Sequence, residues 1–477
     1  MTDNARNSLL VLGAGALIVF LLIVEWPQYL SNSSSLALVI AAQLMLVVIA
    51  KYRSAFFSVL IIVFLLAGTD LPLHGPFLQA RWAVLAVAAV VGVAIYLKDA
   101  THHFKVFHLV ALFCMLSAVV SAFVSQYPAE SRLKAASLSL LFLYSLSGAR
   151  VAVPALHPER FFHRLLLGCE ILVCITGFCY LAVRIEILGN PNSLGAVMGV
   201  VVVPVLLWGF LITESGPRRI RLGFELAVAT LLLMSSFARA GIGAALISCG
   251  LLCFCLRRYR LLINGVVLAC LLAAGAVLFL PRSSEGPSID RSDSIESAFL
   301  YKGHTSSGVF GSRRGVWQET WSVIQQNPWF GTGFGTSLIS GDLTRMNYAR
   351  NHTDSWVVRE HGNSYLAIAE WTGLLGVLPF YFLIALTAIN AGNVFKSLRR
   401  TGNVFSAAVP AAAIVGAGLF HAMFEDWMFA VGYYLCVFFW AIAFIMMDVL
   451  PRRTVVYPPE KFIPIPSHYA GAAASGQ

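Results

Sequence analysis

Residues 222–256 read LGFELAVATLLLMSSFARAGIGAALISCGLLCFCL, an almost uninterrupted apolar run of 35 residues. As a single α-helix, this run would be about 52 Å long, because each residue adds about 1.5 Å. The apolar core of a bilayer is only about 30 Å thick, so one crossing cannot accommodate the run. The stretch therefore predicts two membrane spans joined by a hairpin turn at Arg239-Ala240-Gly241.

Similar apolar runs recur from Leu9 to Val449, and 58% of the chain is hydrophobic while only 12% is charged. Repeated runs of this kind predict an all-α polytopic membrane protein, because a β-barrel would instead have short alternating segments. We expect about 14 transmembrane helices, at residues 8–26, 36–50, 55–69, 82–97, 106–124, 133–152, 162–183, 194–213, 222–238, 241–256, 261–280, 364–391, 404–422 and 428–449.

These spans define the expected organisation of the chain. Residues 1–280 would carry transmembrane helices 1–11, and residues 364–449 would carry helices 12–14. Residues 281–363 would form one large loop containing short helices. Residues 450–477 would form a disordered tail, because they are rich in Pro, Gly, Ala and Ser.

The distribution of Lys and Arg predicts the orientation in the membrane. Alternate loops carry basic clusters such as Arg218/Arg219/Arg221, Arg257/Arg258/Arg260 and Lys396/Arg399/Arg400. Because basic clusters stay in the cytoplasm, both termini are expected there, and the 281–363 loop is expected in the periplasm of a bacterial inner membrane. The same rule accounts for the net charge of +10, so we expect membrane lipids rather than nucleic acid as partners.

Arg239 lies at the predicted outer end of two spans. An arginine at such a depth is costly unless it is paired or faces water, so it is a candidate functional residue. Its planar guanidinium group suits a phosphate ligand. The alternative is that the side chain reaches the outer lipid headgroups.

The polar loop contains a predicted amphipathic helix over residues 312–326, which Asn327-Pro328 would end. Trp317, Trp321 and Ile324 would share one face of this helix, directed toward the membrane. Arg313 and Arg314 lie in its first turn, where positive charge opposes the helix dipole. A bound phosphate would compensate for these charges; a surface helix with a small penalty is the alternative.

The residue pattern gives little support for a metal site or a nucleotide-binding site. The nine cysteines all fall in apolar runs, which argues against a disulfide framework or a zinc site. The glycine-rich segment 331–335 lacks the strand and the spacing of a dinucleotide-binding loop, so we expect a tight turn there. His352 and Asp354 do not match zinc spacing. We therefore expect no metal and no cofactor.

His361 directly precedes a predicted span, followed by Asn363, Tyr365 and Glu370. An imidazole at the membrane surface can accept a proton from a sugar hydroxyl near neutral pH. A polar loop histidine without a role is the alternative. Glu425 and Asp426 form the predicted outer turn between the last two spans. A carboxylate there could orient the base or receive an arginine; an exposed hairpin turn is the alternative.

Four of these segments together resemble the O-antigen ligase and polymerase superfamily. They are Ser-Phe-Ala-Arg-Ala-Gly at 236–241, Arg-x-x-x-Trp at 313–317, Asn-Pro-Trp-Phe-Gly-Thr-Gly-Phe-Gly at 327–335, and the His361-to-Leu366 segment with Glu-Trp-Thr-Gly-Leu-Leu-Gly at 370–376. The resemblance covers roughly residues 222–380. In one departure from the family pattern, Gly362 separates His361 from Asn363.

The resemblance implies a metal-independent glycosyltransferase that uses an undecaprenyl-pyrophosphate-linked glycan as donor at the outer face. Carried over by position, Arg239 and Arg313 or Arg314 would bind the pyrophosphate. His361 would be the catalytic base, with His352 as the reserve candidate, and Asp426 would match the acidic residue of the last outer loop. The accessory candidates are Arg184, Trp317, Asn363, Tyr365 and Glu370.

Three acceptors fit the same motifs. A lipid A-core acceptor, which we place first, makes the protein an O-antigen ligase. A growing glycan makes it an O-antigen or exopolysaccharide polymerase, and a protein hydroxyl makes it an O-oligosaccharyltransferase. The competing classes are a polysaccharide or lipid transporter, which would carry several charges deep in its spans, and a structural subunit. The residues leave the oligomeric state open.

Overall fold

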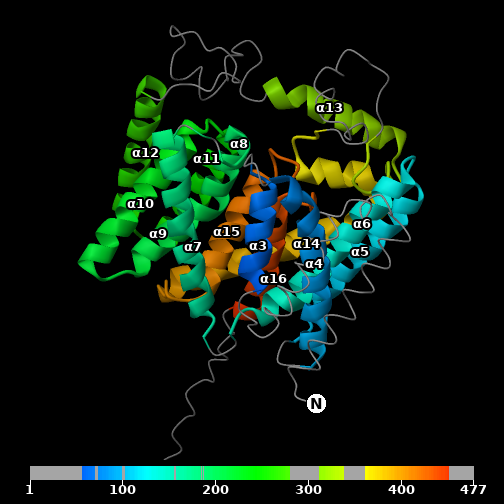
Figure 1. Cartoon of the computed structure of the whole chain (residues 1–477), viewed down its shortest axis with the longest axis horizontal. Helices are drawn as coiled ribbons and strands as arrows, with labels where there is room; N and C mark the ends of the chain where they lie inside the picture. Colours follow the sequence, from blue (N-terminus) through cyan, green and yellow to red (C-terminus); the bar gives the residue numbers. More distant parts are fainter. Residues whose placement is uncertain are drawn as a thin grey trace, which may run out of the picture.

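The computed structural model describes residues 56–69, 74–98, 103–154, 157–183, 185, 187–279, 311–337 and 360–450. Within these ranges the regular secondary structure is entirely helical (Figure 1). The predicted spans 8–26 and 36–50 and the predicted tail lie outside the described residues, as does most of the 281–363 loop. The helical class is confirmed for the described part, and the count of 14 spans stays a prediction.

Each span predicted between residues 55 and 449 overlaps a helical segment, although the last one begins at Tyr434 rather than at residue 428. The α-helices are α3 (Phe56–Ala67), α4 (His74–Lys98), α5 (Val106–Phe123), α6 (Pro128–Tyr144), α7 (Glu159–Gly177), α8 (Pro191–Val197), α9 (Val203–Ile212), α10 (Gly216–Ser235), α11 (Arg239–Cys255), α12 (Tyr259–Phe279), α13 (Gly311–Gln326), α14 (Ser364–Thr401), α15 (Ala408–His421) and α16 (Tyr434–Val449). Three π-helical segments, η3 (Ser145–Ala149), η4 (Phe178–Val183) and η5 (Met198–Val202), continue α6, α7 and α8.

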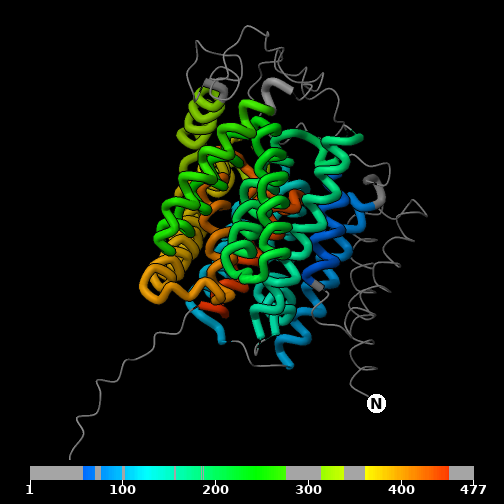
Figure 2. The backbone as a smooth tube through the Cα atoms, turned by 90° about the vertical axis from the view of Figure 1, so that its left-hand side faces the viewer, coloured from blue at the N-terminus to red at the C-terminus, as the bar shows by residue number. Residues whose placement is uncertain are grey.

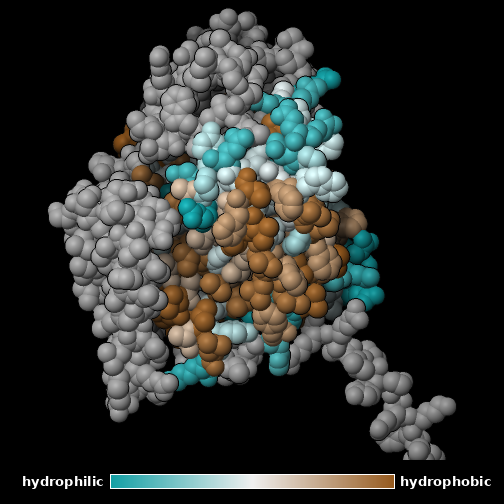
Figure 3. All heavy atoms as spheres, turned by 90° about the vertical axis from the view of Figure 1, so that its right-hand side faces the viewer, coloured by the Kyte–Doolittle hydropathy of each residue, from teal (hydrophilic) through white to brown (hydrophobic). Residues whose placement is uncertain are grey.

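The lengths and surfaces of these helices indicate a membrane protein. Among the described residues, five helical segments are long and apolar enough to cross a bilayer: 77–98, 106–123, 159–183, 191–212 and 364–401. Large apolar side chains are exposed along α5, α7, α12 and α14. Figure 3 shows such an apolar band on one face of the molecule, with polar residues above and below it. Exposed apolar surface of this extent is what a lipid environment requires.

The predicted hairpin is present and turns slightly earlier than expected. α10 ends at Ser235 and α11 begins at Arg239. The start of α11 packs closely against the neighbouring span, because a Cβ atom on Gly199 would lie 2.1 Å from the carbonyl oxygen of Gly241. Small residues at such crossings let helix backbones approach each other. This contact fixes where α11 begins and therefore where Arg239 lies.

The centre of the bundle is formed by α15 and α16. Nearly every residue of α16 is buried, including the large side chain of Trp440. α15 is rich in Ala and Gly, and a Cβ atom on Gly418 would lie 2.6 Å from the ring of Phe439 on α16. The two helices therefore pack tightly, and the connection between them, residues 422–433, is held at one end of the bundle.

α14 is interrupted, contrary to the uninterrupted span predicted at 364–391. Gly373 has φ +63° and ψ −176°, which is not helical. The backbone groups that the break leaves without helical partners bond to residues 328–333 instead. The four hydrogen bonds are Leu374 N to Pro328 O (2.7 Å), Leu375 N to Trp329 O (3.2 Å), Thr332 N to Glu370 O (2.9 Å) and Gly333 N to Trp371 O (3.1 Å). The glycine-rich segment is therefore a structural part of this break, and Gly331, Gly333 and Gly335 all have positive φ angles.

α13 lies across one end of the bundle (Figure 1). The first part of α14, drawn in yellow in Figure 1, lies at the same end. The tube in Figure 2 shows α13 at one end, while most other helices run roughly along the bundle. α13 ends at Gln326, as predicted. Trp317, Trp321 and Ile324 are spaced to share one face of this helix, but Ile324 is 7% exposed while Trp321 is 55% exposed, so the contact of this face with the membrane stays a prediction. The residues of α13 that the protein buries are Thr320, Val323 and Ile324.

Candidate active site

The imidazole of His361 is fully buried and contacts an acidic group through each ring nitrogen. Nδ1 lies 3.3 Å from Oδ2 of Asp426, and Nε2 lies 3.2 Å from Oε1 of Glu370. Nε2 also lies 3.2 Å from the hydroxyl oxygen of Ser337. Asp426 is bound a second time, because the backbone N–H of His361 donates to Oδ2 at 2.8 Å. The ring of Trp371 packs edge-on against the imidazole.

The local sequence around His361 explains how this imidazole is held. Gly362 adopts φ +58°, which favours glycine, and turns the chain into α14. Asn363 caps that helix, since its side-chain oxygen accepts hydrogen bonds from the backbone N–H groups of Tyr365 and Leu366. Ser364 donates its hydroxyl to the carbonyl of Glu425 at 2.7 Å. The start of α14 is thereby attached to the 422–433 connection that carries Asp426.

The two carboxylates favour the protonated imidazole. Burial opposes the charged form, but the hydrogen bonds and charges of Asp426 and Glu370 outweigh it, so the pKa of His361 is raised above its ordinary value of 6.5. Burial likewise works against the Asp426 carboxylate, but the interactions with His361 dominate and lower the pKa of Asp426. The two acids on opposite sides of the ring therefore favour the imidazolium form of His361.

Arg313 lies beside this group and binds two further carboxylates. Its Nη1 donates to Oε1 of Glu360 at 2.6 Å, and its Nη2 donates to Oε1 of Glu425. Burial disfavours the charged form, yet the charges of Glu425 and Glu360 raise the pKa of Arg313. Arg239, at the start of α11, lies close enough for its charge to repel that of Arg313. Two cations from separate helices, α11 and α13, are thus within range of each other's charge, and Arg313 lies against Gly362, the residue after His361.

The break in α14 places Glu370 in the site. Glu370 is 1% exposed, and its backbone carbonyl accepts the hydrogen bond from Thr332 described above. A Cβ atom on Gly331 would lie 2.4 Å from that carbonyl oxygen. The glycine-rich segment therefore packs directly behind Glu370 and leaves no room for a side chain at Gly331.

Among the described residues, the others predicted to belong to the site do not contact the imidazole of His361 in the same way as Asp426 and Glu370. Trp317 donates its indole N–H to the carbonyl of Gly362 at 3.1 Å, so it supports the turn after His361. Tyr365 donates its hydroxyl to the carbonyl of Leu419 on α15 and ties two helices together. Arg314 is exposed, unlike Arg313. Arg184 and His352 lie outside the described residues.

The described residues contain no group of three His, Cys, Asp or Glu side chains arranged to hold a metal ion. The acids around His361 do not form such a group, because they approach opposite nitrogens of the ring. Asp426 approaches Nδ1, and Glu370 approaches Nε2.

Two contacts were not predicted from the sequence. Ser337 follows the glycine-rich turn, and Glu360 precedes His361, but neither has a distinguishing pattern around it. Glu425 and Asp426 were singled out as carboxylates able to receive an arginine or to orient the base. The structure contains both contacts: Arg313 binds Glu425, and Asp426 binds His361.

Residues 224–381 match the model of a protein family described as O-antigen ligase. The matched segment contains Arg239, Arg313, His361 and Glu370, whereas Asp426 lies beyond it. A comparison with curated proteins found no match. The family resemblance inferred from the four segments between residues 222 and 380 is thereby confirmed.

Proposed function

Because residues 224–381 match the O-antigen ligase family, we propose that the protein is a membrane glycosyltransferase that moves a glycan from undecaprenyl pyrophosphate to an acceptor hydroxyl. The proposal depends chiefly on one observation, the buried imidazole of His361 held by Asp426 beside Arg313. A positioned imidazole can take a proton from a hydroxyl group. Fixed guanidinium groups can stabilise the charge that develops on a departing pyrophosphate.

His361 acts as the general base in this proposal. The acceptor hydroxyl takes the place at Nε2 that the hydroxyl of Ser337 has in the resting structure. The acceptor oxygen forms a bond to the anomeric carbon, its proton passes to Nε2, and the bond from that carbon to the pyrophosphate oxygen breaks. Asp426 keeps the proton on Nδ1, so that the lone pair of Nε2 faces the acceptor. Glu370 stabilises the imidazolium ion that forms.

Because the resting imidazole favours the protonated form, the base must first release a proton. Glu370 lies 3.2 Å from Nε2 and is placed to receive that proton and pass it on to water, so that its carboxylate is ionised again before transfer. The same contact makes neutral His361 a stronger base than an isolated imidazole, because the pKa of its conjugate acid is raised.

Arg239 and Arg313 bind the pyrophosphate in this proposal, with the exposed Arg314 able to join them. Two like charges from separate helices repel each other, and an anion bound between them relieves that repulsion. Arg313 already binds Glu425 and Glu360. Glu360 is the partner that a pyrophosphate displaces more readily, because its side chain is 64% exposed.

The expected side of the reaction is the periplasmic face of the inner membrane, since the basic loops lie at the opposite ends of these helices. We place an O-antigen ligase acting on lipid A-core first, a polymerase second and a protein O-oligosaccharyltransferase third. A deletion strain separates the first two, because a lost ligase leaves long lipid-linked polymer and a lost polymerase leaves single repeat units.

The direct test uses the His361→Ala variant of the full-length protein in liposomes containing lipid-linked donor and acceptor. Transfer is expected to stop while protein abundance stays at the wild-type level. The matched control is His157→Ala, because His157 is exposed and lies outside the site. Near-normal transfer by His361→Ala would refute the assignment of the base. Movement of the donor across the membrane without any transfer would instead favour a transporter.

A further inference from the structure

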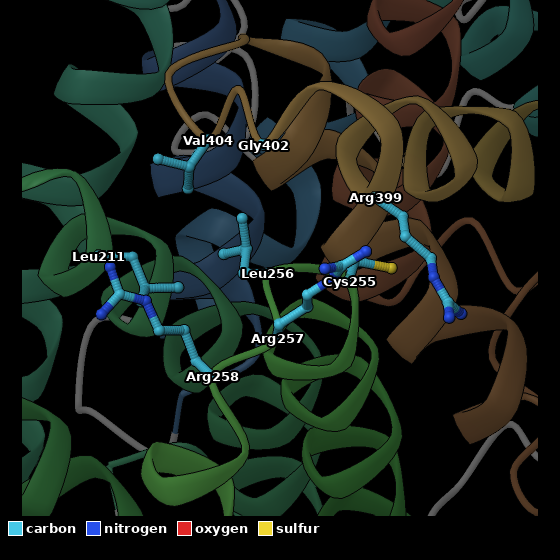
Figure 4. A pocket seen from close by; sticks show the side chains of 8 residues that line it. All are labelled: Leu211, Cys255, Leu256, Arg257, Arg258, Arg399, Gly402 and Val404. Atoms are coloured by element: carbon cyan, nitrogen blue, oxygen red, sulfur yellow. The ribbon is translucent and has the colours of Figure 1, made fainter.

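A cavity of about 270 Å³ lies at the end of the bundle opposite to His361. It is lined by the C-terminal ends of α9, α11 and α14 and by the start of the connection to α15. The lining residues, labelled in Figure 4, are Leu211, Cys255, Leu256, Arg257, Arg258, Arg399, Gly402 and Val404. α11 begins at Arg239 in the candidate active site and reaches this cavity about 24 Å farther along its axis. The cavity therefore lies at the opposite end of the bundle, where the distribution of basic loops predicts the other membrane surface.

The cavity carries three positive charges and no acidic residue. Arg257, Arg258 and Arg399 line it, and its lining contains neither Asp nor Glu. In Figure 4, Arg257 extends toward Cys255 while Arg258 extends toward Leu211 on the other side. The C-terminus of each helix contributes about half a negative charge. Three such ends offset only about half of the three guanidinium charges, so the cavity stays positive and favours an anion.

Arg257 occupies a backbone position that favours glycine. Its φ of +56° lies in the left-handed region, which L-residues with a side chain adopt only at a cost. The N–H of Arg257 bonds to the carbonyl of Phe254 and that of Arg258 to the carbonyl of Cys253, the pattern that closes a helix C-terminus. α14 ends in the same left-handed conformation with Gly402. A strained arginine where glycine would relax the backbone suggests that its side chain has a role.

The uncharged part of the lining is apolar and continues onto exposed apolar surface. Leu211, Leu256 and Val404 form this part. Beside it, the guanidinium group of Arg399 lies 4.5 Å from the ring centre of Phe254, which is 43% exposed. An apolar wall next to a cationic cavity at a membrane surface suits a lipid whose headgroup carries the negative charge.

We propose that this cavity binds the phosphate headgroup of an anionic phospholipid from the leaflet opposite to the candidate active site. Its volume is smaller than the about 300–1,000 Å³ of pockets for larger ligands, which suits a headgroup and excludes the glycan of the donor. Guanidinium groups bind phosphate oxygens in pairs. This inference does not rest on the proposed transfer reaction.

The test measures binding of phosphatidylglycerol to the full-length protein in mixed micelles, with phosphatidylethanolamine and inorganic phosphate as parallel ligands. Phosphatidylglycerol is expected to raise the thermal midpoint of the wild type, and the other two are not. Arg257→Gln and Arg399→Gln should each weaken its binding about fivefold. Arg260→Gln is the matched control, because Arg260 is exposed on the same side but does not line the cavity.

A second variant separates binding from folding. Arg257→Gly should raise the thermal midpoint without lipid, because glycine relaxes the left-handed residue, and should still weaken phosphatidylglycerol binding about fivefold. Equal weakening by Arg260→Gln would overturn the proposal in favour of diffuse surface attraction. An equal response to inorganic phosphate would overturn the assignment to a lipid, and undiminished binding by Arg257→Gly would overturn the site itself.

Discussion

Asp426→Asn is the substitution that most directly tests how His361 is held. Oδ2 of Asp426 accepts the backbone N–H of His361 at 2.8 Å and lies 3.3 Å from Nδ1. Asparagine has nearly the same shape and retains a neutral oxygen for one of these contacts. It loses the charge, and its amide group can donate to Nδ1. In that case, Nδ1 accepts a hydrogen bond and the ring proton moves to Nε2.

Two effects of different size follow from this geometry. A hydrogen bond to a charged group contributes about 1.5–3 kcal/mol, against about 0.5–1.5 kcal/mol for a neutral one. The loss over two bonds is therefore about 2 kcal/mol of stability, equivalent to about 30-fold if all of it were lost from the transition state. A proton on Nε2 removes the lone pair of the base altogether. That change lowers the rate of transfer by about 10²–10⁴-fold and is the dominant effect.

The assay measures glycan transfer by the reconstituted variant together with its thermal midpoint and abundance. Asp448→Asn is the matched control, since Asp448 binds Arg150 through two bonds of 2.7 Å in an ion pair away from the candidate active site. The control should lose stability without a comparable loss of transfer per folded molecule. Transfer by Asp426→Asn within about threefold of wild type would refute the assigned role of Asp426, because even the smaller of the two effects exceeds that range.

Two further substitutions test the groups behind the imidazole. Transfer by the wild type should fall as the pH drops through the raised pKa of His361, because protonation removes the base. Glu370→Gln removes one of the interactions that raise this pKa, so the acidic limb of the pH–rate profile should move to lower pH. An unmoved limb would contradict the role of Glu370. Gly373→Ala should lower the stability to thermal unfolding by about 1–3 kcal/mol, because Gly373 has φ +63° and a Cβ atom there would lie 2.5 Å from backbone atoms of Trp329 and Gly331. The control Gly250→Ala in α11 has open space around it and should be neutral or stabilising. Equal behaviour of the two variants would contradict the described helix break.

The sequence alone determined the elements that depend on local composition. The length of the 222–256 run required a break near Arg239, since a helix of that length does not fit a bilayer. Asn327-Pro328 correctly predicted the end of α13 at Gln326, because the residue before proline disfavours helix. These features follow from hydrophobic length and backbone preference, which a chain carries in any tertiary context.

The tertiary structure decided which groups meet. Asp426 lies 65 residues from His361 in the chain, and the two come together only because the tight packing of α15 against α16 places the 422–433 connection beside the start of α14. The break at Gly373 also escaped prediction, because an isolated chain gives no reason to interrupt an apolar span there. Residues 328–333 stabilise the break by bonding to the backbone groups that it frees. Such pairings depend on distant segments satisfying one another's polar groups, and no local pattern in the sequence encodes them.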